Sequence, residues 1–147
     1  MRFKLEIIPG DEEVIARVHF ASTLTDGIER LCAEYDGVGR LFLYSPERDM
    51  SVFVDYSDIE RVTVEDGKTA VYDKGGSRYI SKMRLYEIEE KLPSCFWKVS
   101  KSALVNREHI VRFDTQFTGG VDVFMTSGSS EQVSRRCLAE IKRRMKI

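Results

Sequence analysis

The sequence predicts a mainly β protein, built as a sandwich or partly open barrel with a few short helices. Three observations lead to this fold class. Apolar residues occur in short strand-like stretches, turn-forming residues separate these stretches every few positions, and the pair Asp66-Gly67 is a strong hairpin signal. Helical periodicity is confined to segments near residues 25–35, 81–92 and 134–145. Many short strands separated by turns are typical of sandwiches and barrels.

Residues 1–40 are expected to form a small β-β-α extension. Residues 3–8 alternate apolar and charged side chains, as a half-buried strand does, and residues 14–20 are predicted to be a second strand. A helix with one apolar face should follow and end near Gly37; its apolar residues are Ile28, Leu31, Cys32 and Tyr35. We expect this unit to pack on the rest of the chain or to make a dimer interface.

Residues 41–147 are expected to form the larger domain. Its early strands are predicted at residues 41–44, 51–56, 59–64, 68–72 and 78–80, with turns at Pro46, Asp66-Gly67 and Lys74-Gly75-Gly76-Ser77. Its later strands are predicted at residues 97–99, 110–114 and 121–126. No internal repeat or low-complexity linker divides the domain.

Two helices are predicted in this domain. Ser81 is expected to cap the first, which ends at Pro93, and Ser134 is expected to cap the second. The apolar stripes would consist of Leu85, Ile88 and Leu92 in the first helix and of Leu138, Ile141 and Met145 in the second. Both helices should therefore pack one face against a core.

The basic charge is concentrated toward the C-terminus, although the net charge of the chain is only −1. Residues 1–92 contain 13 Lys/Arg against 19 Asp/Glu, a net charge of −6, and residues 93–147 contain 10 against 5, a net charge of +5. This asymmetry indicates a nucleic-acid-binding face in the C-terminal part. An uneven surface charge without a binding role would give the same counts.

Catalysis and metal binding have little support in the sequence. The two histidines, His19 and His109, lack a metal-ligand spacing, and no nucleophile elbow or phosphate-binding P-loop is present. Cys32, Cys95 and Cys137 are far apart, which argues against a disulfide framework and against a zinc site. We therefore expect a protein that is not an enzyme and that uses no cofactor and no metal. The chain has no membrane-spanning apolar run and no signal peptide, which predicts a cytoplasmic location.

Residues 96–113 carry the densest group of candidate functional side chains. Lys98, Ser100, Lys101 and Ser102 lie between two aromatic residues and the apolar pair Leu104-Val105. Ammonium groups neutralise phosphate charge, and hydroxyl groups donate hydrogen bonds to phosphate oxygens. An ordinary strand with a solvated polar face would show the same pattern, so this segment alone leaves both interpretations open.

Residues 84–141 resemble the LytTR DNA-binding domain of bacterial transcription regulators. The matching pieces are residues 85–93, residues 96–102, Leu104-Val105-Asn106, His109-Ile110 and residues 133–138. Weaker similarity extends back to about Asp58-Ile59. The match as a whole covers roughly residues 45–147. The chain departs from the family at Ser100-Lys101-Ser102, where His-Arg-Ser or His-Asn-Ser is common, which leaves the base preference of this loop open.

The resemblance implies a LytTR-type β-sandwich or open barrel that reads double-stranded DNA with loops in the major groove rather than with a recognition helix. It also implies a sequence-specific transcription regulator that binds imperfect direct repeats as a homodimer or as paired monomers. Some stand-alone members of the family accompany a membrane protein, so a membrane-protein partner is expected as well. Residues 1–36 would take the place of the receiver domain that many members carry.

Two of three candidate DNA-binding segments lie in loops. The central loop contributes Lys98, Ser100, Lys101 and Ser102, and Lys101 is long enough to reach a guanine edge. Lys68 and Thr69, in the hairpin, match residues of a loop with which family members enter a groove. For Lys68, the alternative is an exposed hairpin lysine without a binding role.

The third candidate segment is the start of the last helix, with Arg135 and Arg136. Backbone amides at a helix N-terminus favour anions, and arginine can pair bidentately with guanine. The family's corresponding arginine reads bases; Arg136 is the first choice for this role and Arg135 is the alternative.

For the aromatic pair Phe96-Trp97 and for Asn106, a structural role is an alternative to a role in binding. Phe96 and Trp97 could stack on bases, which would make the barrel a protein-interaction or single-stranded nucleic-acid-binding module, or they could belong to the core. Asn106 is expected to have a structural role in a left-handed turn before Arg107.

Overall fold

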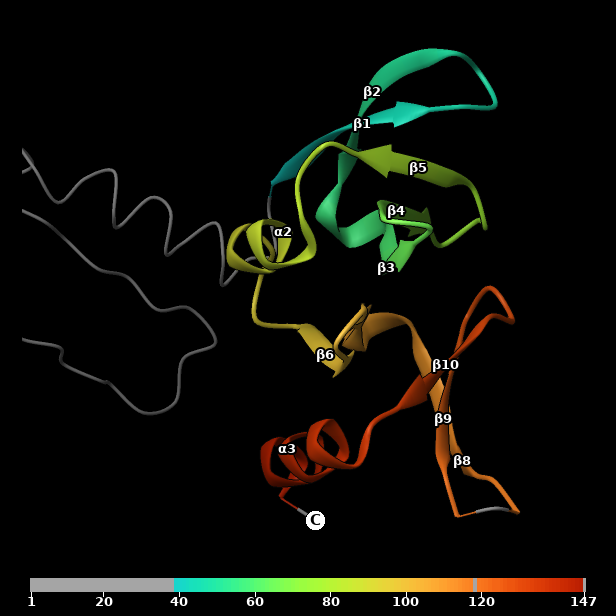
Figure 1. The fold of residues 1–147 in the computed structure, drawn as a ribbon, viewed down its shortest axis with the longest axis vertical. Coiled ribbons are helices and arrows are strands. Elements are labelled where there is room, and N and C mark those ends of the chain that lie inside the picture. The colour runs from blue at the N-terminus through green and yellow to red at the C-terminus, as the bar shows by residue number, and fades with distance from the viewer. Residues whose placement is uncertain (1–38, 118, 147) are drawn as a thin grey trace, which may run out of the picture.

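The structure is a computed structural model that describes residues 39–117 and 119–146. The expected β-β-α extension, with His19 and Cys32, lies outside the described residues. In Figure 1 the larger sheet occupies the upper part of the described chain, and a smaller sheet lies below it with the C-terminal helix. The chain is mainly β, as predicted.

Seven strands form the larger sheet in the order β2-β1-β5-β4-β3-β7-β6, and every recorded pairing is antiparallel. The strands are β1 (Arg40–Ser45), β2 (Met50–Asp55), β3 (Ile59–Glu65), β4 (Lys68–Asp73), β5 (Arg78–Ser81), β6 (Phe96–Ser100) and β7 (Ala103–Asn106). Because β3 pairs with both β4 and β7, it connects the first half of the domain to the second.

The smaller sheet has the order β10-β9-β8. Its strands are β8 (Ile110–Thr115), β9 (Val121–Met125) and β10 (Ser130–Val133); the helices are α2 (Leu85–Lys91) and α3 (Arg135–Met145), with short 3-10 turns η1 (Tyr56–Asp58) and η2 (Arg107–His109). β10 leads almost directly into α3, so the position of this strand determines where the helix begins.

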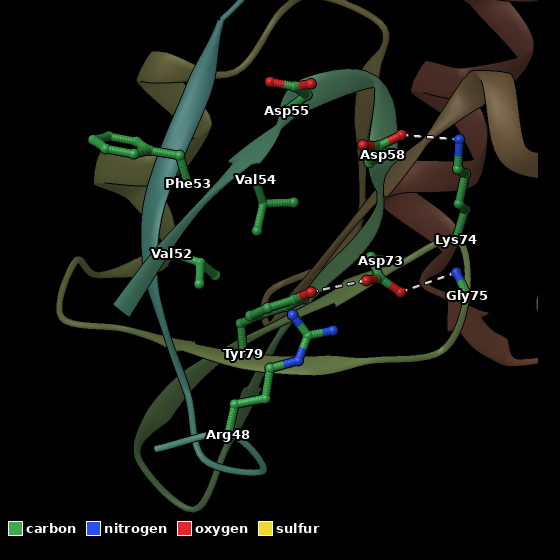
Figure 2. A pocket seen from close by; sticks show the side chains of 10 residues that line it. All are labelled: Arg48, Val52, Phe53, Val54, Asp55, Asp58, Asp73, Lys74, Gly75 and Tyr79. Atoms are coloured by element: carbon green, nitrogen blue, oxygen red, sulfur yellow. Dashed lines mark hydrogen bonds and ion pairs between the residues drawn. The ribbon is translucent and has the colours of Figure 1, made fainter. Parts of the chain in front are cut away.

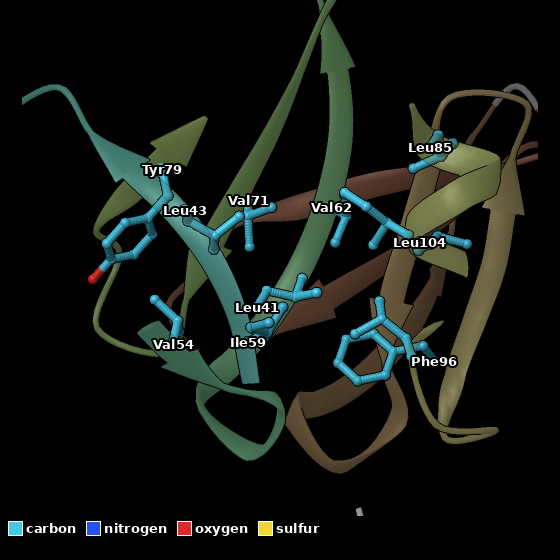
Figure 3. Close-up of a cluster of buried hydrophobic side chains, with 12 residues drawn as sticks. Leu41, Leu43, Val54, Ile59, Val62, Val71, Tyr79, Leu85, Phe96 and Leu104 are labelled. Atoms are coloured by element: carbon cyan, nitrogen blue, oxygen red, sulfur yellow. The ribbon is translucent and has the colours of Figure 1, made fainter. Parts of the chain in front are cut away.

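The first core lies between the larger sheet and α2 (Figure 3). Leu41, Val62 and Leu104 are at most 2% exposed, and α2 contributes Leu85 and Ile88. Burying one such side chain contributes about 1.5–3 kcal/mol. The predicted apolar stripe of this helix is therefore confirmed.

The second core joins β6 and β7 to the smaller sheet and to α3. Trp97 and Val105 pack with Val123, and Ile141 of α3 is 1% exposed. Leu138 and Met145 pack against the same cluster, which confirms the apolar stripe predicted for the last helix. This packing holds α3 against the strand that carries Lys98.

The hairpin between β3 and β4 has the turn that its sequence predicts. Asp66 and Gly67 have φ angles of 50° and 76°, as a two-residue type I′ turn requires. Glycine adopts this conformation without a steric penalty, and aspartate tolerates it better than most residues. The register Glu65↔Lys68 then places Lys68 at the tip.

The predicted cap at Ser81 and the predicted set of strands differ from the structure. Ser81 ends β5 and its hydroxyl accepts from Met83 N at 3.1 Å, whereas α2 starts at Leu85, where Glu87 Oε1 accepts from Arg84 N at 3.3 Å. Strands β7 and β10 were not predicted. β7 is buried throughout and has no alternation, and β10 has a single apolar residue, so neither gives a period-two signal.

Candidate nucleic-acid interface

The β3–β4 hairpin brings Lys68 to one end of the larger sheet. Lys68 is exposed, and it lies opposite Glu65 in the register. Thr69, the other candidate in this hairpin, is only 6% exposed and lies between Val64 and Ser81 in the register. Its side chain is therefore poorly placed to contact DNA, whereas the Lys68 ammonium group is free to do so.

The loop between β6 and β7 lies beside this hairpin. Val64 N, near the end of β3, donates a hydrogen bond of 2.8 Å to Ser102 O. Lys101 and Ser102 are exposed, and Ser100 is half-buried. Ser100 Oγ accepts from Ser102 N at 3.2 Å, so the Ser100 hydroxyl helps to shape the loop.

The start of α3 is bonded to β6, the strand that leads into this loop. Ser134 N donates to Val99 O at 2.8 Å, and the Ser134 hydroxyl accepts from Cys137 N at 3.2 Å, which confirms the predicted cap. Arg135 and Arg136 are the first two residues of the helix, and both are exposed. Serine in this position satisfies a free amide of the first turn.

Two backbone hydrogen bonds thus gather three segments that are far apart in the sequence. We call the resulting surface the basic edge, and its cations are Lys68, Lys98, Lys101, Arg135 and Arg136. Within the described residues, none of these side chains has an ion pair or a hydrogen bond to protein. Ion pairs with carboxylates instead involve Arg61, Lys74, Arg78, Arg107, Arg112, Arg143 and Arg144. The basic edge is therefore suited to an external polyanion.

Lys82 extends this edge and was missed in the sequence. It follows Ser81, which lies opposite Thr69 in the register between β5 and β4, and its side chain is exposed. The sequence places Lys82 between a strand and a helix without a motif around it. Only the pairing of β5 with β4 reveals its proximity to the hairpin.

Glu65 is the carboxylate nearest to Lys68 in the register, and other groups already engage it. Its Oε1 accepts from Tyr72 Oη at 2.7 Å and from Thr63 Oγ1 at 3.1 Å, and its Oε2 accepts from Arg78 Nη2 at 3.1 Å. Desolvation raises the pKa of Glu65, but these hydrogen bonds outweigh it and lower the pKa below its usual value. The charge of Glu65 is thus compensated within the sheet.

The aromatic residues that could have stacked on bases belong to the cores. Phe96 is 7% exposed and Trp97 is 6% exposed. The Arg107 guanidinium lies 5.8 Å from the centre of the Trp97 ring. Trp97 therefore does not provide an open stacking platform for bases.

Asn106 has the structural role that was expected, but in a different conformation. Its φ is −83°, so the predicted left-handed turn is wrong. Nδ2 donates to Ile59 O at 2.9 Å, and Oδ1 accepts from Glu108 N at 3.0 Å. The buried side chain thereby joins β7 to the start of β3 and caps η2.

A surface hollow of about 500 Å³ lies beside the β4–β5 turn (Figure 2). The register Ile59↔Asp73 puts this turn at the end of β3 and β4 opposite the hairpin. Asp58 pairs with Lys74 at 2.9 Å, and Asp73 accepts from Tyr79 Oη at 3.0 Å and from Gly75 N at 2.9 Å. Three carboxylates, Asp55, Asp58 and Asp73, outnumber the two cations Arg48 and Lys74 in its lining, so this hollow is a poorer site for nucleic acid than the basic edge.

Metal ligands do not cluster in the described part of the chain: residues 39–117 and 119–146 contain no group of three or more His, Cys, Asp or Glu side chains that could hold an ion. Cys95 and Cys137 are free and half-buried. In the same residues, no helix has the length and apolar character needed to span a bilayer.

Comparison with protein families matches residues 49–146 to the model of the LytTr DNA-binding domain, which covers more than half of the 147 residues. A solved structure from Bacillus cereus, the LytTr DNA-binding domain of a putative methyl-accepting/DNA response regulator, has the same fold. It aligns with a TM-score of 0.68 and 22% identity over 76% of this chain and all of that chain.

Curated relatives include regulators of two bacterial species. A sensory transduction protein LytT of Bacillus cereus is 31% identical over 103 residues, which is 69% of this chain and 42% of that protein. An uncharacterized HTH-type transcriptional regulator of Staphylococcus aureus is 36% identical over 66 residues, which is 45% of each chain. The chain thus spans less than half the length of these relatives.

Proposed function

The chain belongs to the family of LytTr DNA-binding domains, and from this premise we propose that it is a sequence-specific transcription regulator that reads double-stranded DNA with its basic edge. Loops would enter successive major grooves, and the start of α3 would add arginine contacts. The function needs no catalysis and no cofactor. If the target is chromosomal DNA, the protein acts in the bacterial cytoplasm.

One observation carries this proposal: three cation-bearing segments converge at one end of the larger sheet. The hydrogen bonds from Val64 N to Ser102 O and from Ser134 N to Val99 O, both 2.8 Å, join these segments. Cations without protein partners that lie on adjacent loops can neutralise several phosphates of one duplex. Arginine and lysine side chains in the same place can reach guanine O6 and N7.

The residues of the basic edge and of its loops would share base readout and phosphate binding. Arg136 would read a base, with Arg135 as the alternative, and Lys101 would reach a guanine edge or a phosphate. Lys68, Lys98 and Lys82 would neutralise phosphates, and the hydroxyl groups of Ser102 and, to a smaller extent, Ser100 would bond phosphate oxygens. We leave Thr69 out of this set because its side chain is buried.

Membership of the family is the only basis for the assembly that we propose on DNA. We propose two protomers on an imperfect direct repeat, with residues 1–40 as a separate unit that packs on residues 41–147 or joins two copies. A membrane-protein partner is also proposed. Light scattering of the protein with and without a repeat-bearing duplex tests the first point; a mass of one protomer per repeat-bearing duplex would contradict it.

The alternative of a single-stranded nucleic-acid or protein-interaction module is weaker. It relied on an accessible Trp97, and this residue is 6% exposed within the second core. Substituting Trp97 with Ala should therefore unfold the domain. A folded Trp97→Ala protein that has lost binding to a ligand would revive the alternative.

The proposal is tested by selecting bound duplexes from a random DNA pool at moderate salt. The wild-type protein should enrich a repeated motif, and Lys101→Ala/Arg136→Ala should not. A matched control is Lys74→Ala/Arg112→Ala, which removes the same charge from two exposed cations paired with Asp58 and Asp114. Binding without enrichment by the wild-type protein would refute sequence-specific recognition.

A further inference from the structure

Two adjacent residues at the start of β3, Glu60 and Arg61, hold the β9–β10 hairpin against the larger sheet; we call this pair the β3 clamp. Glu60 is fully buried, at 0% exposure. Its Oε1 accepts from Ser127 N at 2.8 Å and from Thr126 Oγ1 at 3.1 Å, and its Oε2 accepts from Ser127 Oγ at 2.6 Å. These bonds fix the turn of the hairpin.

Arg61 holds the following strand, β10. Its Nη1 lies 2.6 Å from Glu131 Oε1, in an ion pair whose side chains are 12% and 21% exposed. The guanidinium carbon lies 3.8 Å from the centre of the Tyr72 ring. A planar guanidinium can pair with the carboxylate through its edge and stack its face on the ring, whereas a lysine ammonium is a compact charge with no flat face to stack.

The held strand leads directly to the arginines of the basic edge. Glu131 is in β10, Ser134 caps α3, and Arg135 and Arg136 follow. At its other end β3 runs into the hairpin that carries Lys68. The β3 clamp therefore fixes the start of α3 to the same strand that carries Lys68.

Base readout depends on this geometry more than phosphate binding does. A lysine can follow a phosphate through a small displacement, because its charge acts over several ångströms in water. A bidentate contact between arginine and guanine requires two aligned hydrogen bonds. A shift of α3 relative to the hairpin should thus reduce discrimination between sequences before it reduces binding to DNA in general.

We propose that Arg61 and Glu131 are positioning residues for DNA readout: their ion pair sets the place of Arg135 and Arg136 relative to Lys68 and Lys101. The inference rests on the proposed function and adds the part of the fold that determines its specificity. Neither residue needs to touch DNA.

The electrostatics of Glu131 agree with this role. Burial raises the pKa of the Glu131 carboxyl, and the charge and hydrogen bond of Arg61 act against that rise. Removing Arg61 would leave a half-buried carboxylate without its counter-charge, which favours displacement of β10 toward water. Since β10 precedes α3, this displacement would move the two arginines.

The test compares Arg61→Gln and Glu131→Gln with wild-type protein in the full chain. Dissociation constants are measured for a duplex recovered from the random pool and for a random duplex, after the binding-competent fraction has been titrated. Both variants should reduce the ratio of the two affinities at least tenfold, while the affinity for random DNA changes less than threefold. Arg61→Lys should also reduce the ratio. It keeps the positive charge, but it loses the planar group that pairs with Glu131 and stacks on Tyr72.

A matched control is Arg112→Gln. Arg112 also pairs with a carboxylate, Asp114 at 3.0 Å, and lies over an aromatic ring, Phe124 at 4.2 Å, but both contacts stay within the smaller sheet. This variant should keep the wild-type ratio. The double variant Arg61→Gln/Glu131→Gln should reduce the ratio no more than the single variants do, because all three break the same pair.

The outcomes separate the positioning role of Arg61 and Glu131 from the proposed function. A wild-type protein that enriches no sequence refutes the proposed function. If the wild-type protein is specific and the folded Arg61→Gln and Glu131→Gln variants keep its affinity ratio, only the positioning role of Arg61 and Glu131 is refuted. A purely stabilising role of the pair would give that result with a smaller binding-competent fraction. If Arg61→Gln does not fold, Glu131→Gln decides the question.

Discussion

The two ends of strands β3 and β4 differ in how their charged side chains are used. At the hairpin end, the hairpin that carries Lys68 is bonded to the loop that carries Lys101, and β6, which enters that loop, is bonded to the start of α3. These cations have no protein partner within the described residues. At the turn end, Asp58 and Asp73 engage Lys74, Tyr79 and backbone amides.

The comparison shows that one sheet separates charges that are paired within the fold from charges that are left unpaired. Charges at the turn end are used within the protein, as the ion pair and hydrogen bonds there show. Charges at the hairpin end remain available to an external partner. The number of cations matters less than the number that are not paired with a carboxylate, so a chain with a net charge of −1 can still leave several cations available to a polyanion.

The largest effect is expected from removing several cations of the hairpin end together. Lys68→Gln/Lys98→Gln/Lys101→Gln should weaken DNA binding and reduce the slope of log affinity against log salt by about 0.9 for each lost phosphate contact. Fluorescence anisotropy at a series of salt concentrations measures this slope. The charge-matched control is Lys74→Gln/Arg107→Gln/Arg112→Gln, in which all three cations have carboxylate partners. If the two triple variants changed the affinity and the salt slope equally, unpaired and paired cations would not differ in their contribution to DNA binding.

A smaller but more specific effect is expected at the start of α3. Arg136→Ala should cost roughly 1–3 kcal/mol at the selected sequence and much less on random DNA, as the loss of a base contact does. Competition binding with both duplexes measures the two losses. Equal losses would make Arg136 a phosphate contact, and the same experiment on Arg135→Ala then tests the alternative residue.

The turn glycines provide a matched pair for the two ends. Gly67 in the hairpin and Gly76 in the opposite turn have φ angles of 76° and 88°, and an added Cβ would meet nothing within 4 Å at either site. Each substitution to Ala should lower the free energy of unfolding by about 1–2 kcal/mol through backbone strain alone. Urea denaturation measures that loss. Only Gly67→Ala should also weaken DNA binding. If both substitutions weakened it equally, the result would argue against a contact between the hairpin and DNA.

The smallest effect concerns the pH dependence of stability. The folded pKa of Glu65 is lowered. Glu65 therefore contributes stability that is present above its unfolded pKa of about 4.3 and is lost as the pH falls through the folded value. Glu131 has a raised pKa, so its ionisation should reduce stability as the pH rises from the unfolded value through the folded value.

Urea titrations from about pH 3 to about pH 7 test both signs, because this interval contains the unfolded pKa of glutamate. Glu65→Gln should remove part of the loss of stability in acid. Glu131→Gln should remove part of the loss of stability that accompanies ionisation of Glu131 as the pH rises. Equal pH profiles for the wild-type protein and Glu65→Gln would contradict the hydrogen-bonded carboxylate at the hairpin end.

Local chemistry explains which parts of the fold could be predicted. The pair Asp66-Gly67 defines its own turn, because both residues tolerate a positive φ. The apolar stripe with Ile88 and the stripe with Ile141 define the buried helix faces by their spacing. The cap at Ser134 needs only the amide of Cys137, three residues ahead.

The unpredicted features depend on contacts between distant residues. β10 has one apolar residue and forms because it pairs with β9 and because Arg61 binds Glu131, 70 residues away. Lys82 joins the basic edge only through the pairing of β5 with β4. Glu60 is an acidic residue that local patterns would place in solvent, but three hydrogen bonds from Thr126 and Ser127 keep it buried. No short sequence window contains these partners.

The central claim is that three distant segments bind DNA as one surface, and an NMR titration of the ¹⁵N-labelled full chain with a selected duplex tests it most directly. We predict that amide signals of residues 66–68, 99–102 and 134–137 change together at one equivalent of DNA, while those of residues 73–77 in the opposite turn stay in place. Changes centred on residues 73–77, or confined to one of the three segments, would contradict the claim.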